Sequence, residues 1–236
     1  MCGRIVQKNA LGLAIVSGTD IDSDSRVRKT QARYNGAPRQ ELLVIRRHPE
    51  TGKPVMSLMR WGLIHHQAYE IPKVQPINAR AEGVKRTPPF ADAYRARRCI
   101  VPIDAFFEWK AIKGAKAKQP YAVAMADGTP FGVAAIWENW RNPVTGHWVR
   151  TFCIITCPAN SLVNHIHDRM PVIIGEAFYE RWLDDQPEAD ALLKPYPAEL
   201  MTIWPVSTRV NNYSNDDASV LDKVMAAVER EDRERQ

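Results

Sequence analysis

Residues 99–137 read CIVPIDAFFEWKAIKGAKAKQPYAVAMADGTPFGVAAIW, and their pattern indicates the fold class. The stretch contains four short runs rich in apolar, aromatic and β-branched residues, a composition typical of β-strands. These runs are Cys99–Pro102, Ala105–Lys110, Tyr121–Ala126 and Phe131–Trp137. Asp127-Gly128 separates the last two runs, and an Asp-Gly pair in this position predicts a β-hairpin. We therefore expect a β-sheet at the centre of the chain.

The flanking sequence adds more strands and only short helices. Helical spacing predicts short helices at three places, whereas Arg33–Pro38 has the residues of a turn. No repeat divides the sequence, so we expect one domain over residues 1–228 and a charged, disordered tail over 229–236. Many short strands with few helices indicate an α+β protein built on a curved, mostly antiparallel β-sheet or open barrel. The further strands are predicted at Glu41–Arg47, Val55–Ile64, Trp148–Thr156 and Ile203–Val206, and the helices at Pro89–Arg97, Phe178–Leu183 and Ala189–Leu193.

The composition is that of a globular protein with a mild positive charge. The 236 residues include 32 Lys and Arg against 27 Asp and Glu, and the net charge of +5 permits a polyanionic partner without requiring one. No apolar run is long enough to cross a bilayer, so we expect no membrane association. None of the four cysteines forms a C-x-x-C pair, and we interpret Cys99, Cys153 and Cys157 as reduced residues of a cytoplasmic protein.

Cys2 follows Met1 directly, and removal of Met1 would leave a thiol and a free α-amine on one Cα. An α-amine has a pKa of about 7.7–8.0 and a cysteine thiol one of about 8.5, so both nucleophilic forms are accessible near neutral pH. The amine can serve as the base for the thiol, as in N-terminal-nucleophile amidases. Alternatively, both groups can add to one aldehyde carbon and close a five-membered thiazolidine. Cys2 can equally be an incidental residue at a frayed terminus.

Glu108 lies among large apolar residues. Strand alternation predicts that Phe107 and Trp109 share one face and that Phe106, Glu108 and Lys110 share the other. A carboxyl beside aromatic rings loses water, and desolvation raises its pKa toward the range of a general acid at neutral pH. The alternative is an ion pair between Glu108 and Lys110 on a solvated face.

A second dense cluster runs from His165 to Pro171. The histidines His165 and His167 have no partner at metal-ligand spacing, so we expect no metal and a single catalytic histidine oriented by its neighbours. The alternative is a structural turn. Asn78 and Arg80 lie two residues apart, so in an extended segment they share a face, where an amide could orient an amine and an arginine could bind a phosphate. A locally satisfied turn explains them equally well.

Two tryptophans and two arginines would suit a groove for single-stranded nucleic acid, in which bases stack on rings and phosphates pair with arginine. A tryptophan in a β-rich protein is more often part of the core, so each ring alone is weak evidence. The four residues are Arg4, Trp61, Trp109 and Arg169.

Taken together, these motifs resemble the SOS-response-associated peptidase family, whose members bind abasic sites in DNA. The motifs occur in the family's order and cover most of the chain, from Cys2 to Val210. One departure is Gly36, where an apolar or β-branched residue is expected. The matching segments are Met1–Arg4, Arg33–Asn35 with Ala37-Pro38, Trp61–Ile64, Ile77–Glu82, Phe106–Lys110 with Gln119–Tyr121, Ile155-Thr156 and His165–Pro171.

The resemblance implies that the protein's own site removes Met1 and that Cys2 forms a thiazolidine with an abasic site in single-stranded DNA. It implies a monomer in the cytoplasm, associated with the nucleoid when bound to DNA, with no metal and no cofactor. It also implies the site residues. Cys2 would be the nucleophile, Asn78 would hold its amine, Glu108 would be the general acid and base, and His167 would move a proton at the sugar. DNA would be bound by Arg4, Trp61, Arg80, Trp109, Thr156 and Arg169.

Two other readings of the N-terminal cysteine stay open. An amidohydrolase of the class II glutamine amidotransferase type also begins with Cys-Gly, but it does not call for Glu108 between aromatic residues. A non-covalent module for single-stranded DNA would use the same groove and would bind intact and abasic strands alike.

Overall fold

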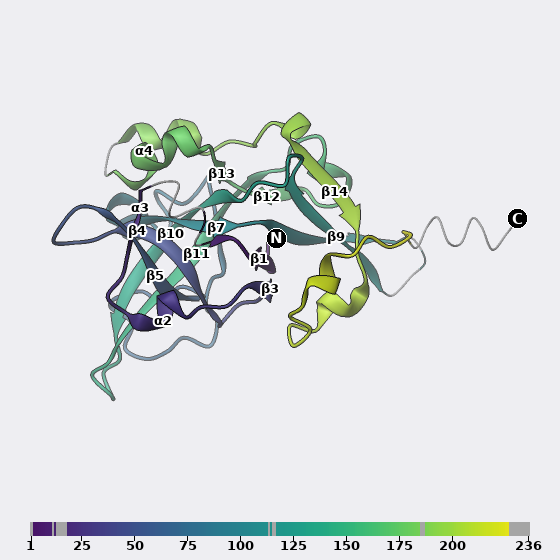
Figure 1. Ribbon diagram of the computed structural model, residues 1–236. Coiled ribbons are helices and arrows are strands. Elements are labelled where there is room, and N and C mark those ends of the chain that lie inside the picture. The colour runs from purple at the N-terminus through teal and green to yellow at the C-terminus, as the bar shows by residue number, and fades with distance from the viewer. Residues whose placement is uncertain are drawn as a thin grey trace, which may run out of the picture.

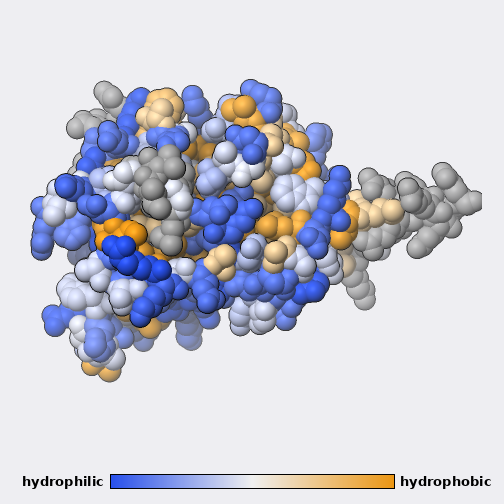
Figure 2. Space-filling model, viewed as in Figure 1, coloured by the Kyte–Doolittle hydropathy of each residue, from blue (hydrophilic) through white to orange (hydrophobic). Residues whose placement is uncertain are grey.

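The computed structural model describes residues 2–10, 12, 18–112, 114, 117–184 and 187–226 (Figure 1). The predicted charged tail, 229–236, lies outside the described residues. No helix in the described part of the chain is long and apolar enough to cross a membrane. The face shown in Figure 2 is mostly hydrophilic, with small and separate apolar patches.

Five strands close into a barrel. Its hydrogen-bonded order is β11-β10-β7-β4-β5, and β5 returns to β11. All neighbouring pairs are antiparallel except β5 with β11, which is parallel and closes the circuit. Apolar side chains from these strands fill the main core. The strands are β4 (Glu41–Arg47), β5 (Pro54–Trp61), β7 (Arg98–Ile103), β10 (Phe131–Arg141) and β11 (Trp148–Pro158).

A second, five-stranded antiparallel sheet lies beside the barrel, in the order β14-β9-β8-β1-β3. Phe106 belongs to the main core, whereas Phe107 belongs to a smaller apolar cluster against which Trp109 packs. The predicted alternation along this segment is therefore confirmed. The strands are β1 (Ile5–Gln7), β3 (Arg33–Gly36), β8 (Ala105–Ala111), β9 (Lys118–Met125) and β14 (Met201–Pro205).

Short elements complete the molecule. Four short strands extend the barrel sheet, and the helices have one or two turns each. The expected fold class, an α+β protein on a curved and mostly antiparallel sheet, is confirmed, and the curvature reaches full closure. The strands are β2 (Asp20–Ile21), β6 (Asn78–Arg80), β12 (Arg169–Pro171) and β13 (Ile173–Ile174). The helices are α2 (Ser25–Arg28), α3 (Ala91–Ala96), α4 (Tyr179–Leu183), η1 (Val163–His165), η2 (Glu176–Phe178), η3 (Pro187–Leu192), η4 (Ala198–Leu200), η5 (Thr208–Asn211) and η6 (Ala218–Leu221).

Two local predictions are wrong. Asp127-Gly128 does form a tight turn, with Gly128 at a φ of 74°, but the strands on either side do not pair. Each strand has two edges. Those of β9 are taken by β8 and β14, and those of β10 by β7 on one side and by β13 and β11 on the other. The turn therefore carries the chain from one sheet to the other. Residues 33–36, predicted as part of a turn, form strand β3, because they pair with β1.

Candidate active site

Pairing of β1 with β8 brings the N-terminus to Glu108. Ile5 lies opposite Phe106, and the Phe107 N–H donates to the Arg4 carbonyl at 3.0 Å. Because the strands are antiparallel, the residues that precede Ile5 run along β8 toward Glu108. Cys2 is fully buried, at 0% exposure, and its carbonyl accepts a hydrogen bond from Asn78 Nδ2 at 2.9 Å.

The other side of the site is formed where β6 and β12 pair with the C-terminal end of β11. β6 runs parallel to it, with Arg80 opposite Thr156, and β12 runs antiparallel to it, with Arg169 opposite Pro158. His167 precedes β12, and its Nε2 lies 4.0 Å from Glu108 Oε2. Three segments far apart in the sequence therefore converge on Cys2.

The Glu108 carboxyl is buried, at 2% exposure. Burial raises its pKa from 4.5 to about 7, and nearby positive charges, first the N-terminal ammonium and then Lys118, oppose a part of this rise. A carboxyl with a pKa in this range can both give and accept a proton near neutral pH. The alternative of a solvated ion pair with Lys110 does not fit a carboxyl that is removed from water.

The Cys2 thiol and the His167 ring are both neutral at pH 7. Burial, followed by the nearby Glu108 charge, raises the pKa of the Cys2 thiol. Burial lowers the pKa of His167. The Arg169 N–H donates to His167 Nδ1 at 3.0 Å, so the neutral ring carries its proton on Nε2, the nitrogen that faces Glu108. Asp168 Oδ1, 3.0 Å from Nδ1, can accept from the ring once it is protonated.

The three arginines predicted to bind DNA have different surroundings. Arg80 is exposed, and the described part of the chain gives its side chain no hydrogen bond or ion pair. Arg169 forms a bidentate ion pair with Glu82, at 2.5 and 2.9 Å, and donates to the Thr156 carbonyl at 2.6 Å. Arg4 donates to protein oxygens of Asn35, Val210 and Asn211 at 3.0, 2.6 and 3.3 Å.

Two residues predicted to contact DNA lie in the interior instead. Trp61 is fully buried, stacks on Phe152 with the ring centroids 6.0 Å apart, and donates from Nε1 to the Ile77 carbonyl. Thr156 is also fully buried. Neither offers a surface to a nucleotide in this structure, because both fill the junction of β11 with its neighbours. Trp109 differs, since it is half-buried and its Nε1 donates to Asn211 Oδ1 at 2.7 Å.

Three residues of the site carry roles that the sequence did not indicate. Asn35 is fully buried and directs its Nδ2 at carbonyls of the 210–215 segment, which it ties to β3 together with Arg4. Glu82 binds Arg169, and the positive charge of the exposed Lys118 lowers the pKa of Glu108 slightly. Asn35 and Glu82 stand in segments that the sequence analysis singled out, but nothing in a linear pattern predicts their partners.

Comparisons with known proteins show the family of this chain. Residues 1–213 match the family described as SOS response associated peptidase (SRAP). Abasic site processing protein YoaM of Bacillus subtilis is 34% identical over 228 residues, which cover 94% of this chain and 98% of that protein. Abasic site processing protein HMCES of Xenopus tropicalis is 30% identical over 84% of this chain and 66% of its own length. A crystal structure of a Bacteroides thetaiotaomicron protein superposes with a TM-score of 0.85 at 25% identity, over 95% of this chain and all of that one. This chain therefore belongs to the SOS response associated peptidase family.

Proposed function

We propose that this protein captures abasic sites in single-stranded DNA by forming a covalent bond through Cys2. Two of its relatives, YoaM and HMCES, are named abasic site processing proteins. The observation that carries the proposal is the pairing of a buried Cys2 with a carboxyl, Glu108, whose pKa is about 7. A carboxyl that titrates at the working pH is the group that a reaction with several proton transfers requires.

The reaction has three steps. Hydrolysis of the Met1–Cys2 peptide bond consumes one water and releases methionine, which frees the Cys2 α-amine. The amine then adds to C1′ of the ring-opened sugar, an aldehyde carbon, and the hydroxyl of this adduct leaves as water to give an imine. Finally the thiol sulfur adds to the imine carbon, the thiol proton is transferred to the amine nitrogen, and a thiazolidine results. The crosslink thus releases one water per sugar and needs no oxidant or reductant.

Glu108 is assigned both proton roles. Its protonated form donates to the oxygen that departs during ring opening and imine formation. Its ionised form removes the proton of the Cys2 thiol, which needs a base because its own pKa is raised. His167 presents Nε2–H as a donor to the sugar hydroxyl. Asn78 fixes the Cys2 backbone through the carbonyl hydrogen bond, which keeps the amine and thiol in place.

The DNA strand is proposed to run past Arg80 and Arg169. Arg80 is exposed and available to a phosphate, whereas Arg169 would exchange or share its Glu82 partner. Arg4 and Trp109, which lie in cation–π contact at 6.0 Å, would border the strand near Cys2. Local positive charge of this kind is sufficient for a short single-stranded site.

A denaturing gel tests the proposal. Protein whose intact mass shows the loss of Met1 is mixed with a single-stranded oligonucleotide containing one abasic site. A heat-stable, slowly migrating band is expected for the wild type and not for Cys2→Ala. A tetrahydrofuran analogue of the abasic site has no aldehyde and serves as the control strand that gives no band. The absence of a band from processed wild type would refute the proposal.

A further inference from the structure

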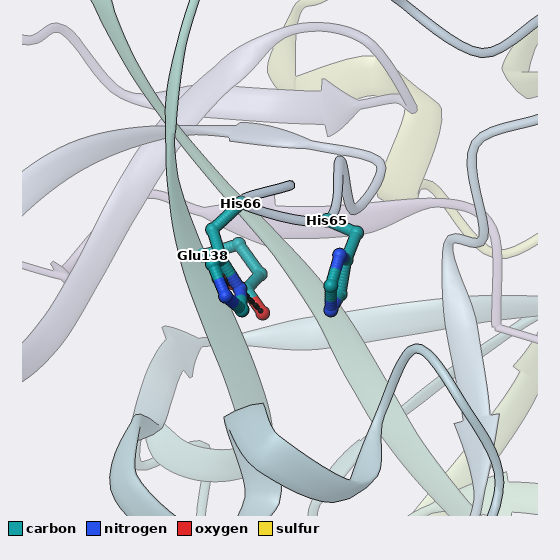
Figure 3. A group of neighbouring side chains, drawn as sticks. All are labelled: His65, His66 and Glu138. Carbon is teal, nitrogen blue, oxygen red and sulfur yellow. Dashed lines mark hydrogen bonds and ion pairs between the residues drawn. The ribbon is translucent and has the colours of Figure 1, made fainter. Parts of the chain in front are cut away.

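The loop between β5 and β6 carries two adjacent histidines that lie against β10, outside the Cys2 site. His65, His66 and Glu138 offer ligand atoms that all lie within 4.8 Å of one another (Figure 3). The two imidazole rings lie side by side, with centroids 4.3 Å apart. The cluster therefore brings together two nitrogen donors and one carboxylate.

Glu138 is the unusual member of this cluster, because it is fully buried on a barrel strand. Its Oε1 accepts from Arg97 at 2.9 Å and lies at hydrogen-bond distance, 3.4 Å, from His66 Nδ1. Its Oε2 is buried, accepts no hydrogen bond from the residues described, and lies 3.3 Å from His66 Nδ1. A buried carboxylate oxygen without a donor is destabilising. An oxygen in this position, facing two imidazoles, is suited to a cation.

The backbone holds the histidine loop on this strand edge. The Ile64 N–H donates to Thr151 Oγ1 at 3.0 Å, and Thr151 lies opposite Glu138 in the β10–β11 register. On the other side of the histidines, Trp140 Nε1 donates to the Ala68 carbonyl at 2.7 Å. Both ends of the short segment are therefore anchored to the same hairpin that supplies the carboxylate, which gives the arrangement a rigid support.

We propose that His65, His66 and Glu138 bind a divalent first-row cation of the zinc class. Two imidazole nitrogens and one carboxylate oxygen are ligands that Zn²⁺ accepts, with a fourth position left for water. In a tetrahedral site with bonds of about 2.0–2.1 Å, neighbouring ligand atoms lie about 3.3 Å apart. The ligand atoms of this cluster, which lie within 4.8 Å of one another, therefore need to approach by at most about 1.5 Å. His65 is half-buried and His66 is exposed, so side-chain rotation closes this gap. Arg97 orients the carboxylate as an outer partner.

The expectation of no metal was based on His165 and His167, which are not part of this cluster. A cation bound here would link the loop that carries His65 and His66 to strand β10 through Glu138. Because the cluster is distinct from Cys2, metal binding and DNA capture can be measured separately.

The test uses Cys2→Ala protein, because a processed N-terminal cysteine is itself a chelator. Calorimetric titration with Zn²⁺ is expected to show one equivalent bound at micromolar metal, together with a rise in melting temperature. His66→Ala, at an exposed position, is expected to lose both effects, and Glu138→Gln is expected to lose them as well. His147→Ala, at another exposed histidine, is the matched control and is expected to retain them. Absence of stoichiometric binding, or binding that survives His66→Ala, would overturn the proposal.

Discussion

Replacement of Glu108 by glutamine is expected to have opposite effects on folding stability and on the rate of crosslinking. Burial raises the pKa of this carboxyl from 4.5 to about 7. Each pH unit corresponds to 1.36 kcal/mol, so ionising the buried carboxyl costs about 3 kcal/mol of folding stability. The folded protein binds this proton more tightly than the unfolded chain does. The free energy of unfolding of the wild type therefore falls as the pH rises from about 4.5 to about 7, and this contribution is constant above that range.

Urea denaturation of the wild type and Glu108→Gln at pH 5, 6, 7 and 8 measures the effect. We expect the variant to become more stable relative to the wild type by about 2.5 kcal/mol between pH 5 and pH 8, because glutamine has no charge to bury. We also expect crosslinking by the variant to slow by at least about 100-fold, the usual contribution of a general acid or base. A substitution that stabilises the protein and removes its activity would identify Glu108 as a group retained for chemistry.

A stability difference that is independent of pH between 5 and 8 would refute this reasoning, since it would mean that Glu108 titrates normally. Glu199→Gln, at an exposed carboxylate, is the matched control, and it is expected to crosslink at the wild-type rate.

Further predictions concern the strand path, the core and the anchoring of Cys2. Arg80→Ala should weaken non-covalent binding to single-stranded DNA and reduce the slope of log K against log salt by about 0.7, as measured by fluorescence anisotropy; an unchanged slope would remove Arg80 from the phosphate contacts. Trp61→Ala should lower the free energy of unfolding by about 3–5 kcal/mol in urea, because the ring is fully buried; a loss below 1 kcal/mol would contradict its place in the core. Asn78→Ala removes one partly buried hydrogen bond to the Cys2 carbonyl, worth about 1 kcal/mol, and should slow single-turnover crosslinking about fivefold with little change in DNA affinity. The opposite pattern, weaker binding at an unchanged rate, would assign Asn78 to the DNA instead.

The strands and the chemical character of Glu108 were predictable because both depend on local pattern. Alternation along residues 105–110 gave the correct faces, and aromatic neighbours correctly indicated a desolvated carboxyl. The pairing of strands was not predictable in the same way. Asp127-Gly128 forms the expected turn but joins two sheets, because the edges of β9 and β10 are occupied by strands distant in sequence.

Side-chain exposure also depended on these distant contacts. Trp61 and Thr156 belong to motifs that suggest a ligand surface, yet closure of the barrel between β5 and β11 and the attachment of β6 bury both. The partner of Arg169, Glu82, is 87 residues away, and two of the three partners of Arg4, Val210 and Asn211, lie more than 200 residues away near the C-terminal end of the described chain. Such pairs follow from topology and not from spacing.

Peptide mapping of the crosslink tests most directly whether Cys2 supplies both bonds to the sugar. The conjugate is digested with nuclease and trypsin without borohydride and analysed by tandem mass spectrometry. The thiazolidine reaction predicts that the sugar remnant is found on the peptide Cys2-Gly3-Arg4, with no free thiol on Cys2. A remnant on Lys118, the amine whose charge acts on Glu108, or a conjugate that survives only after borohydride reduction, would contradict it.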